Sequence, residues 1–91
     1  MRVIEASIPV VNRLGLHARA AAKLVKLLAG FQSEVILKRE HREINAKSIM
    51  GVMMLAAGKG SVLQARISGP DQQACHDAIQ ALFAARFDEG Q

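Results

Sequence analysis

His17 and Arg19 stand at the start of an alanine-rich run, and their types and spacing suit phosphoryl-group chemistry. Alanine is the best helix former and Gly15 interrupts the pattern just before the run, so a helix should begin beside His17. The first amides of a helix lack intrahelical partners and the helix dipole is positive there, which favours a bound anion. Because histidine is not a preferred N-terminal cap, we interpret His17 as a nucleophile that carries a phosphoryl group, with Arg19 holding its oxygens. A surface histidine that ends a helix by accident is the alternative.

A second candidate site begins at Ser48, at the start of a predicted helix over residues 48–57. Serine is a strong N-terminal cap because its hydroxyl accepts a hydrogen bond from an unpartnered amide, and this structural role suffices on its own. Ile49, Met50 and Met53 lie partly off the face that this helix would bury. Methionine adapts to differently shaped surfaces, so such a patch suits partner docking if it is exposed. Burial of all three in the core is the alternative.

Hydrophobic periodicity and turn residues predict the elements that must position these side chains. Strands are expected over residues 3–10, 31–38, 43–46 and 61–68, and helices over 18–29, 48–57 and 71–86. Residues 87–91 read as a short acidic tail. The order β-α-β-β-α-β-α predicts an α+β two-layer fold, in which a four-stranded antiparallel sheet is covered on one face by three helices.

Size and composition limit the classes of protein that the chain can belong to. We expect residues 1–91 to form one small domain, too small for a closed active site, so that its chemistry lies on the surface and needs a partner. The net charge of +4 suits docking on acidic protein surfaces. The lone Cys75 allows no internal disulfide and fits the cytoplasm. Neither a signal peptide nor a membrane-spanning run is expected, and the proposed chemistry needs no metal, nucleotide or other cofactor on this chain.

Two motifs carry a resemblance to a known family. Gly15-Leu16-His17-Ala18-Arg19-Ala20 resembles the active-site signature of HPr, the histidine-containing phosphocarrier of the bacterial phosphoenolpyruvate-dependent sugar phosphotransferase system. The segment 45–53, Asn-Ala-Lys-Ser-Ile-Met-Gly-Val-Met, resembles the regulatory-serine region of the same family. The two motifs are in register and the resemblance covers essentially the whole chain. It implies an open-faced β-sandwich that acts as a monomer.

The resemblance also implies a function and partners. His17 would accept a phosphoryl group from phosphorylated enzyme I, through Nδ1 in this family, and pass it to a histidine of a IIA domain. The protein would thus be a stoichiometric carrier. Ser48 matches the serine that HPr kinase/phosphorylase modifies in many bacteria. We expect docking to use Leu16, Ala20, Lys26, Ile49, Met50 and Met53.

Ala20 departs from the usual proline of the signature, and this leaves the nitrogen-related paralogue of HPr, a regulatory phosphocarrier, as an alternative. A small basic RNA-binding domain is a second alternative, but such sheets need surface aromatics for base stacking, and the chain has three Phe, no Tyr and no Trp. A ligand-sensing domain without covalent chemistry is a third, and it would leave the His-x-Arg pair unexplained.

Overall fold

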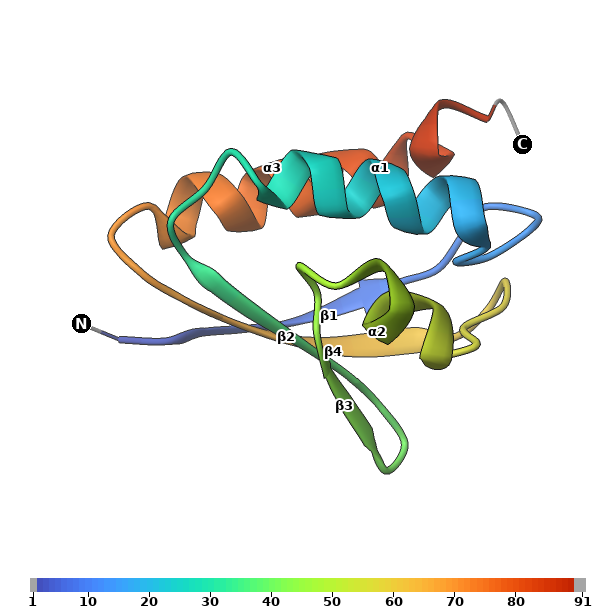
Figure 1. Cartoon of the computed structure of the whole chain (residues 1–91), viewed down its shortest axis with the longest axis horizontal. Coiled ribbons are helices and arrows are strands. Elements are labelled where there is room, and N and C mark those ends of the chain that lie inside the picture. The colour runs from blue at the N-terminus through green and yellow to red at the C-terminus, as the bar shows by residue number, and fades with distance from the viewer. Residues whose placement is uncertain (1, 90–91) are drawn as a thin grey trace.

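The computed structural model describes residues 2–89, which form a four-stranded sheet with three helices packed on one of its faces (Figure 1). The elements follow the predicted order: β1 (Ile4–Pro9), α1 (Ala18–Leu28), β2 (Glu34–Arg39), β3 (Arg42–Asn45), α2 (Ile49–Met54), β4 (Val62–Ser68), α3 (Gln72–Ala84) and a 3-10 turn η1 (Arg86–Asp88). The strand order is β1-β4-β2-β3, and all neighbours are antiparallel. The predicted α+β class is confirmed.

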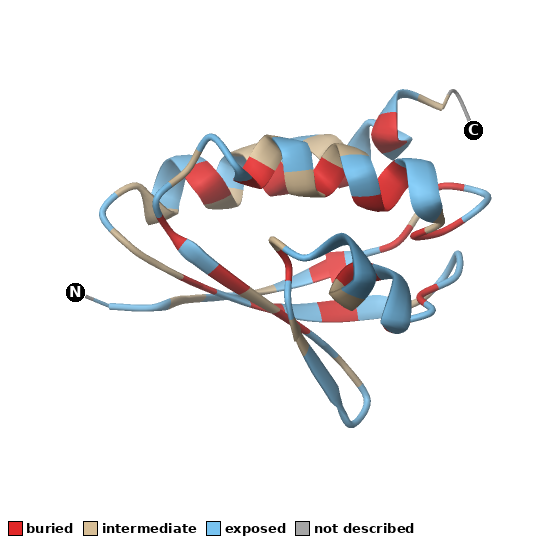
Figure 2. Cartoon of the chain, viewed as in Figure 1, coloured by how far each residue is buried: buried red, intermediate tan, exposed pale blue. Residues whose placement is uncertain are grey.

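The core lies between the sheet and the helices, and the strand periodicity accounts for it. Successive strand residues point to opposite faces, so in β4 Leu63, Ala65 and Ile67 are buried while Gln64 and Arg66 are exposed. Figure 2 shows the buried residues on the sheet face that the helices cover. Helix α1 completes this layer with the buried residues Ala20, Ala21, Leu24 and Leu28. Within residues 2–89, no helix has the length and apolar character needed to cross a membrane.

The second strand begins at Glu34, later than the predicted start at residue 31, because the start of α3 holds the preceding loop. The Asp71 carboxylate accepts hydrogen bonds from the amides of Gln32 and Ser33, at 2.8 and 2.9 Å, and from the Ser33 hydroxyl, at 2.5 Å. Because these amides donate to a side chain, they are not available for hydrogen bonds to a neighbouring strand. Residues 31–33 therefore form a loop instead of a strand.

The C-terminal segment differs most from its prediction as an acidic tail. Residues 86–88 form a turn, and the Phe87 ring is buried against Phe83, with the two centroids 4.8 Å apart at 63°. In Figure 1 this red segment lies above the start of α1. Residues 90 and 91, also predicted as tail, lie outside the described residues.

The Asp71 contacts predict a pH-dependent stability. Hydrogen bonds, first from the Ser33 hydroxyl and then from the Gln32 amide, lower the pKa of Asp71 below its ordinary 3.8. A carboxyl with a lowered folded pKa stabilises the fold above its unfolded pKa, and the contribution is lost as pH falls through the folded value. We therefore expect Asp71→Asn to lower the melting temperature by several degrees at neutral pH, with the gap to wild type narrowing below pH 3.8. Circular dichroism melts over a pH series measure this.

Asp77→Asn is the matched control, because Asp77 is exposed on the same helix and contacts only its helix neighbours Gln73 and His76 among the described residues. It should melt like wild type at each pH. A deficit of Asp71→Asn that stays constant at all pH values would show that the ionised carboxylate does not hold the loop.

Candidate functional site

The loop before α1 is pinned to the chain that follows α2. Gly15 has a φ of +65°, and a Cβ at this position would lie 2.4 Å from the carbonyl oxygen of Ala57, so only glycine fits. The next amide, of Leu16, donates to that same oxygen at 2.9 Å. These contacts place the start of α1 beside the end of α2.

His17 is the N-cap residue of α1, in the extended conformation with φ −75° and ψ 179°. Its carbonyl accepts the first helical hydrogen bond from the Ala21 amide at 2.8 Å, but its side chain caps nothing. The imidazole is therefore available at a helix start, where the first amides lack intrahelical partners. The side chain is 28 % exposed and lies in an open cavity of about 590 Å³ lined by Leu14, His17, Ala18, Arg19, Lys23, Asp88 and Glu89.

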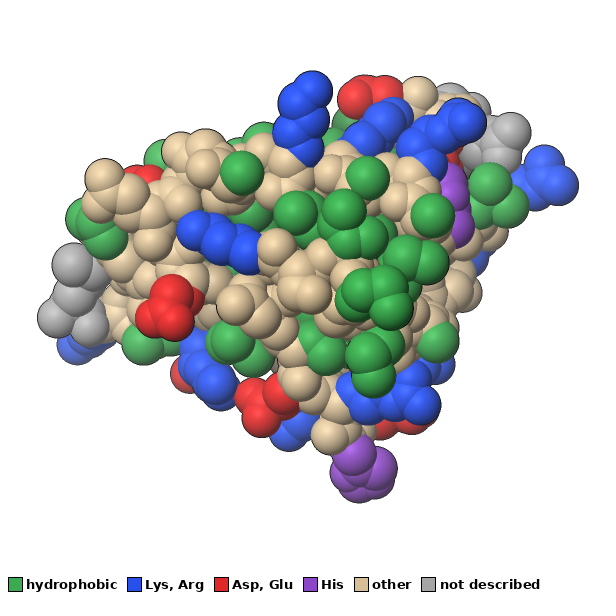
Figure 3. Space-filling view, in the orientation of Figure 1, with side chains coloured by type: hydrophobic (Ala, Val, Ile, Leu, Met, Phe, Trp, Pro, Cys, Tyr) green, Lys and Arg blue, Asp and Glu red, His purple; other side chains and the backbone are tan. Residues whose placement is uncertain are grey.

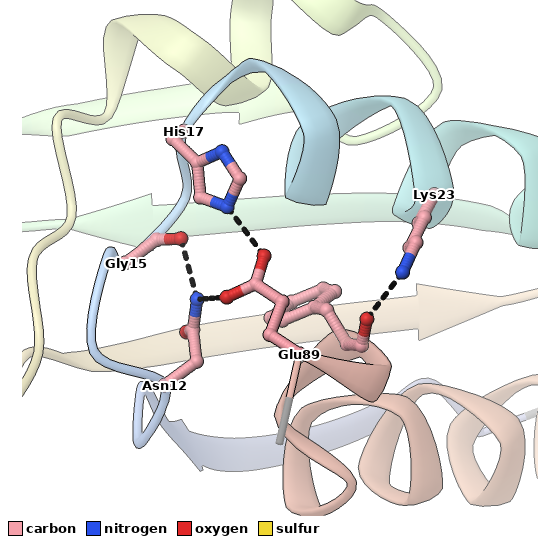
Figure 4. Close-up of polar contacts among 6 residues, drawn as sticks. Asn12, Gly15, His17, Lys23 and Glu89 are labelled. Atoms are coloured by element: carbon pink, nitrogen blue, oxygen red, sulfur yellow. Dashed lines mark hydrogen bonds and ion pairs between the residues drawn. The ribbon is translucent and has the colours of Figure 1, made fainter. Parts of the chain in front are cut away.

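One nitrogen of the His17 ring is in contact with a residue that the sequence did not suggest. Nε2 of His17 is bonded to Oε2 of Glu89, and Oε1 of Glu89 accepts from Nδ2 of Asn12 at 3.0 Å (Figure 4). The same Asn12 amide donates to the Gly15 carbonyl at 2.8 Å. The hydrogen bond from Asn12, and after it the hydrogen bond with His17, lower the pKa of Glu89. Within residues 2–89, Nδ1 of His17 has no hydrogen-bond partner.

Three basic residues of α1 lie near the site, and only one of them, Lys23, makes a side-chain hydrogen bond among the described residues. Arg19 is exposed on the first turn of α1 and lines the same cavity as His17. Lys23, one turn further, donates to the Phe87 carbonyl at 2.5 Å and so ties the C-terminal turn to α1 (Figure 4). Lys26 is exposed and lines a second open cavity with Lys23.

Most of the large exposed hydrophobic side chains lie on α2 or in the loop before α1. Ile49, Met50 and Met53 are all exposed, Met50 at 70 %, and the sequence did not suggest two more, Leu14 and Met54. Figure 3 shows hydrophobic side chains gathered over this part of the surface, with Lys and Arg side chains around them. We call Leu14, Ile49, Met50, Met53 and Met54 the α2 patch.

Two expected docking residues are not at the surface. Leu16 is 5 % exposed and Ala20 is 0 % exposed, and both belong to the hydrophobic core. Direct contact of their side chains with a partner stays a prediction, which this burial does not support. The cause is the packing of the Gly15 loop and of α1, which turns both side chains inward, and local sequence does not reveal such packing.

Helix α2 is held at both ends by side chains. At its start the Ser48 hydroxyl accepts from the Gly51 amide at 3.1 Å, so the predicted capping role is confirmed, and Ser48 is exposed. At its end, Arg39 donates to the Leu55 carbonyl at 3.1 Å, and Arg42 donates to the Met54 carbonyl. Because the loop before α1 packs at this far end, Ser48 and His17 lie toward opposite ends of α2.

Within residues 2–89, no three side chains of the His, Cys, Asp and Glu types lie close enough together to hold a metal ion. The partly exposed imidazole, the helix start and Arg19 together can bind and exchange a small anionic group. Cys75 is buried in α3, where burial, with some help from the charge of Asp71, raises the pKa of its thiol.

Comparison with known proteins agrees with this geometry. The family model described as "PTS HPr component phosphorylation site" matches residues 4–85. The phosphocarrier protein HPr of Cupriavidus necator is 55% identical over 82 residues, which cover 90% of this chain and 92% of that protein. The phosphocarrier protein NPr of Shewanella violacea is 39% identical over 89 residues, covering 98% of each. The crystal structure of HPr-C-His from Thermoanaerobacter tengcongensis has a TM-score of 0.90 at 35% identity, covering 94% of this chain and 97% of that one.

The resemblance that the two motifs carried is therefore confirmed over most of the chain, in sequence and in fold. The chain belongs to the HPr family, the phosphocarrier proteins of the phosphotransferase system.

Proposed function

We propose that His17 is the residue of this phosphocarrier that takes the phosphoryl group from phosphorylated enzyme I and gives it to a histidine of a IIA domain. The observation that carries the proposal is the N-cap position of His17, where the imidazole caps nothing and faces an open cavity. In the transfer, the lone pair of Nδ1 attacks phosphorus while the P–N bond of the donor phosphohistidine breaks and its electron pair returns to the donor ring. In the onward transfer His17 is the donor: a nitrogen of the IIA histidine attacks phosphorus, and the electron pair of the broken P–N bond returns to the His17 ring.

Arg19 and the first amides of α1 are proposed to hold the phosphoryl oxygens. Hydrogen bonds from charged donors to anionic oxygens are the strong ones, and preorganised donors stabilise charge in the transition state. Arg19 is exposed at the rim of the cavity that holds His17. A surface position suits a carrier, because the group must leave again.

The α2 patch is proposed to be the docking surface for both partners. Flexible methionines can pack against differently shaped surfaces, and a carrier must fit a donor and an acceptor in turn. The net charge of +4 favours partners with acidic rims around an apolar centre. Lys26 is proposed to extend this surface along α1.

The branch of the pathway is also a proposal. The match to HPr at 55% identity exceeds the match to NPr at 39%, which favours sugar transport over the nitrogen branch. The carrier is proposed to act in the cytoplasm and as a monomer, since His17 must be open to two partners in turn.

His17→Ala tests the proposed carrier residue. After incubation with enzyme I, Mg²⁺ and phosphoenolpyruvate, the wild type should gain the mass of a single acid-labile phosphoryl group, and His17→Ala should gain none, because the nucleophile is gone. Intact-mass spectrometry measures both. The matched control is His41→Ala, whose histidine is exposed in the turn between β2 and β3; it should be phosphorylated like wild type. Phosphorylation that persists in His17→Ala would remove the proposal.

Met50→Glu and Met53→Glu test the docking surface. Each buries a charge against the apolar centre of a partner, so KM for the carrier in the enzyme I reaction should rise about tenfold, by analogy with interface residues worth more than ~1 kcal/mol, while kcat changes little. Val62→Glu is the control, since Val62 is another exposed hydrophobic residue, on the uncovered face of β4. If Met50→Glu and Met53→Glu had the same KM as the control Val62→Glu, the docking surface would have to lie outside the α2 patch.

Ser48→Asp tests the proposed regulatory site, in comparison with Ser48→Asn. Both keep an N-cap acceptor for the Gly51 amide, but only the aspartate adds negative charge at the edge of the α2 patch. Transfer from enzyme I should slow for Ser48→Asp and stay near wild type for Ser48→Asn, in steady-state kinetics at low ionic strength. Equal rates for both variants would contradict a charge-based control at Ser48.

A further inference from the structure

Glu89 lies 72 positions from His17 in the chain, yet its carboxylate contacts the His17 ring. Building on the proposed function, we propose that Glu89 is a positioning residue for phosphoryl transfer, which holds the proton of His17 on Nε2 and so leaves the lone pair of Nδ1 free to attack. Two features carry the proposal: both oxygens of this carboxylate are engaged, and the segment that bears it is held firmly in place.

The hydrogen bonding defines which ring nitrogen is protonated. An ionised carboxylate can only accept hydrogen bonds, and the Asn12 contact, which lowers the pKa of Glu89, favours the ionised form. The hydrogen between Glu89 and His17 must therefore come from the ring nitrogen Nε2. In the neutral ring the lone pair then resides on Nδ1, the nitrogen without a partner among the described residues.

Asn12 is itself positioned for this contact. It is fully buried, and its Nδ2 donates both to Gly15 and to Glu89, at 2.8 and 3.0 Å. Within residues 2–89 its Oδ1 has no hydrogen-bond partner. A buried unpaired acceptor is unfavourable. The stabilising contribution of the Asn12 side chain therefore comes from the two hydrogen bonds that its Nδ2 donates. Because the same Nδ2 donates to the Gly15 carbonyl, Asn12 holds the Glu89 carboxylate in a fixed position relative to the loop that precedes His17.

The C-terminal strap, residues 86–89, holds Glu89 at the site. Arg86, Phe87 and Asp88 have positive φ angles of 56°, 54° and 61°, a conformation that side-chain-bearing residues disfavour. It persists because the Phe87 ring is buried and the Phe87 carbonyl accepts from Lys23 at 2.5 Å. The Glu89 side chain is only 10 % exposed. Strained backbone that the surroundings over-determine is typical of functional segments.

The carboxylate also has a role once transfer begins. When Nδ1 forms its bond to phosphorus, the ring keeps its Nε2 proton and becomes cationic. The negative charge of Glu89 compensates that cation, as a carboxylate does behind the histidine of a hydrolase triad. When the group leaves, the N–P electron pair returns to Nδ1 and the proton stays where it was. No proton needs to be exchanged with solvent in either direction.

The test uses the full-length chain with Glu89→Ala, Glu89→Gln and the matched control Glu34→Gln, whose carboxylate is exposed at the start of β2. Two-bond ¹H–¹⁵N spectra of the His17 ring report its tautomer without any partner protein. We expect wild type and Glu34→Gln to show Nε2 protonated and Nδ1 bare, and Glu89→Ala to show a mixture of tautomers. Glu89→Gln keeps an acceptor for the Nε2 proton, so it should retain the tautomer without the charge.

Transfer kinetics with enzyme I form the second measurement. We expect kcat to fall about tenfold or more in Glu89→Ala, by analogy with the roughly 10–100-fold losses when carboxylates that orient metal-bound histidines are removed. The fall should be smaller in Glu89→Gln, and KM should be unchanged because the α2 patch is intact. An unaltered ring spectrum in Glu89→Ala would overturn the inference, and so would an altered spectrum with an unchanged kcat. If wild type gained no phosphoryl group at all, the proposed function would fail, whereas the tautomer measurement would still decide the role of Glu89.

Discussion

The close approach of the Gly15 backbone to Ala57 is the constraint on which the functional face depends. A side chain at position 15 would collide with the Ala57 carbonyl, and the following amide bonds that same oxygen. The loop therefore joins the start of α1 to the end of α2, although the two segments are far apart in sequence. As a result His17, the proposed nucleophile, and the α2 patch share one surface, and a partner docked on the patch as proposed would have its reacting group near His17.

Helix α2 could not present this surface alone. It spans residues Ile49–Met54, and a helix of that length is marginal in water because nucleation is unfavourable. Its ends are held by Ser48 and by two arginines of the neighbouring hairpin, Arg39 and Arg42. With its ends satisfied in this way, the helix can leave most of its hydrophobic side chains exposed and bury mainly Val52.

The site also shows how the fold handles charge. The start of α1 attracts anions, and Arg19 adds to this attraction, whereas the Glu89 carboxylate lies on the opposite nitrogen of the ring. Negative charge is thus placed where it can balance a cationic ring, and positive charge where the phosphoryl oxygens would lie.

Local features of the sequence were sufficient to predict much of this protein. The alternation in β4, the alanine-rich α1 with His17 before it, and the Ser48 cap follow from periodicity and capping, which depend on neighbours a few positions away. The fold class followed from the order of these elements.

Only the tertiary structure decided what depends on distant contacts. It buried Leu16 and Ala20 in the core, shortened β2 through Asp71, and folded the predicted tail back so that Glu89 meets His17. No local pattern links positions 17 and 89, because their contact arises from the burial of Phe87 against α3 and from the bond between its carbonyl and Lys23. Burial and long-range hydrogen bonds are properties of the assembled layers, and these interactions exist only once the helices have packed on the sheet.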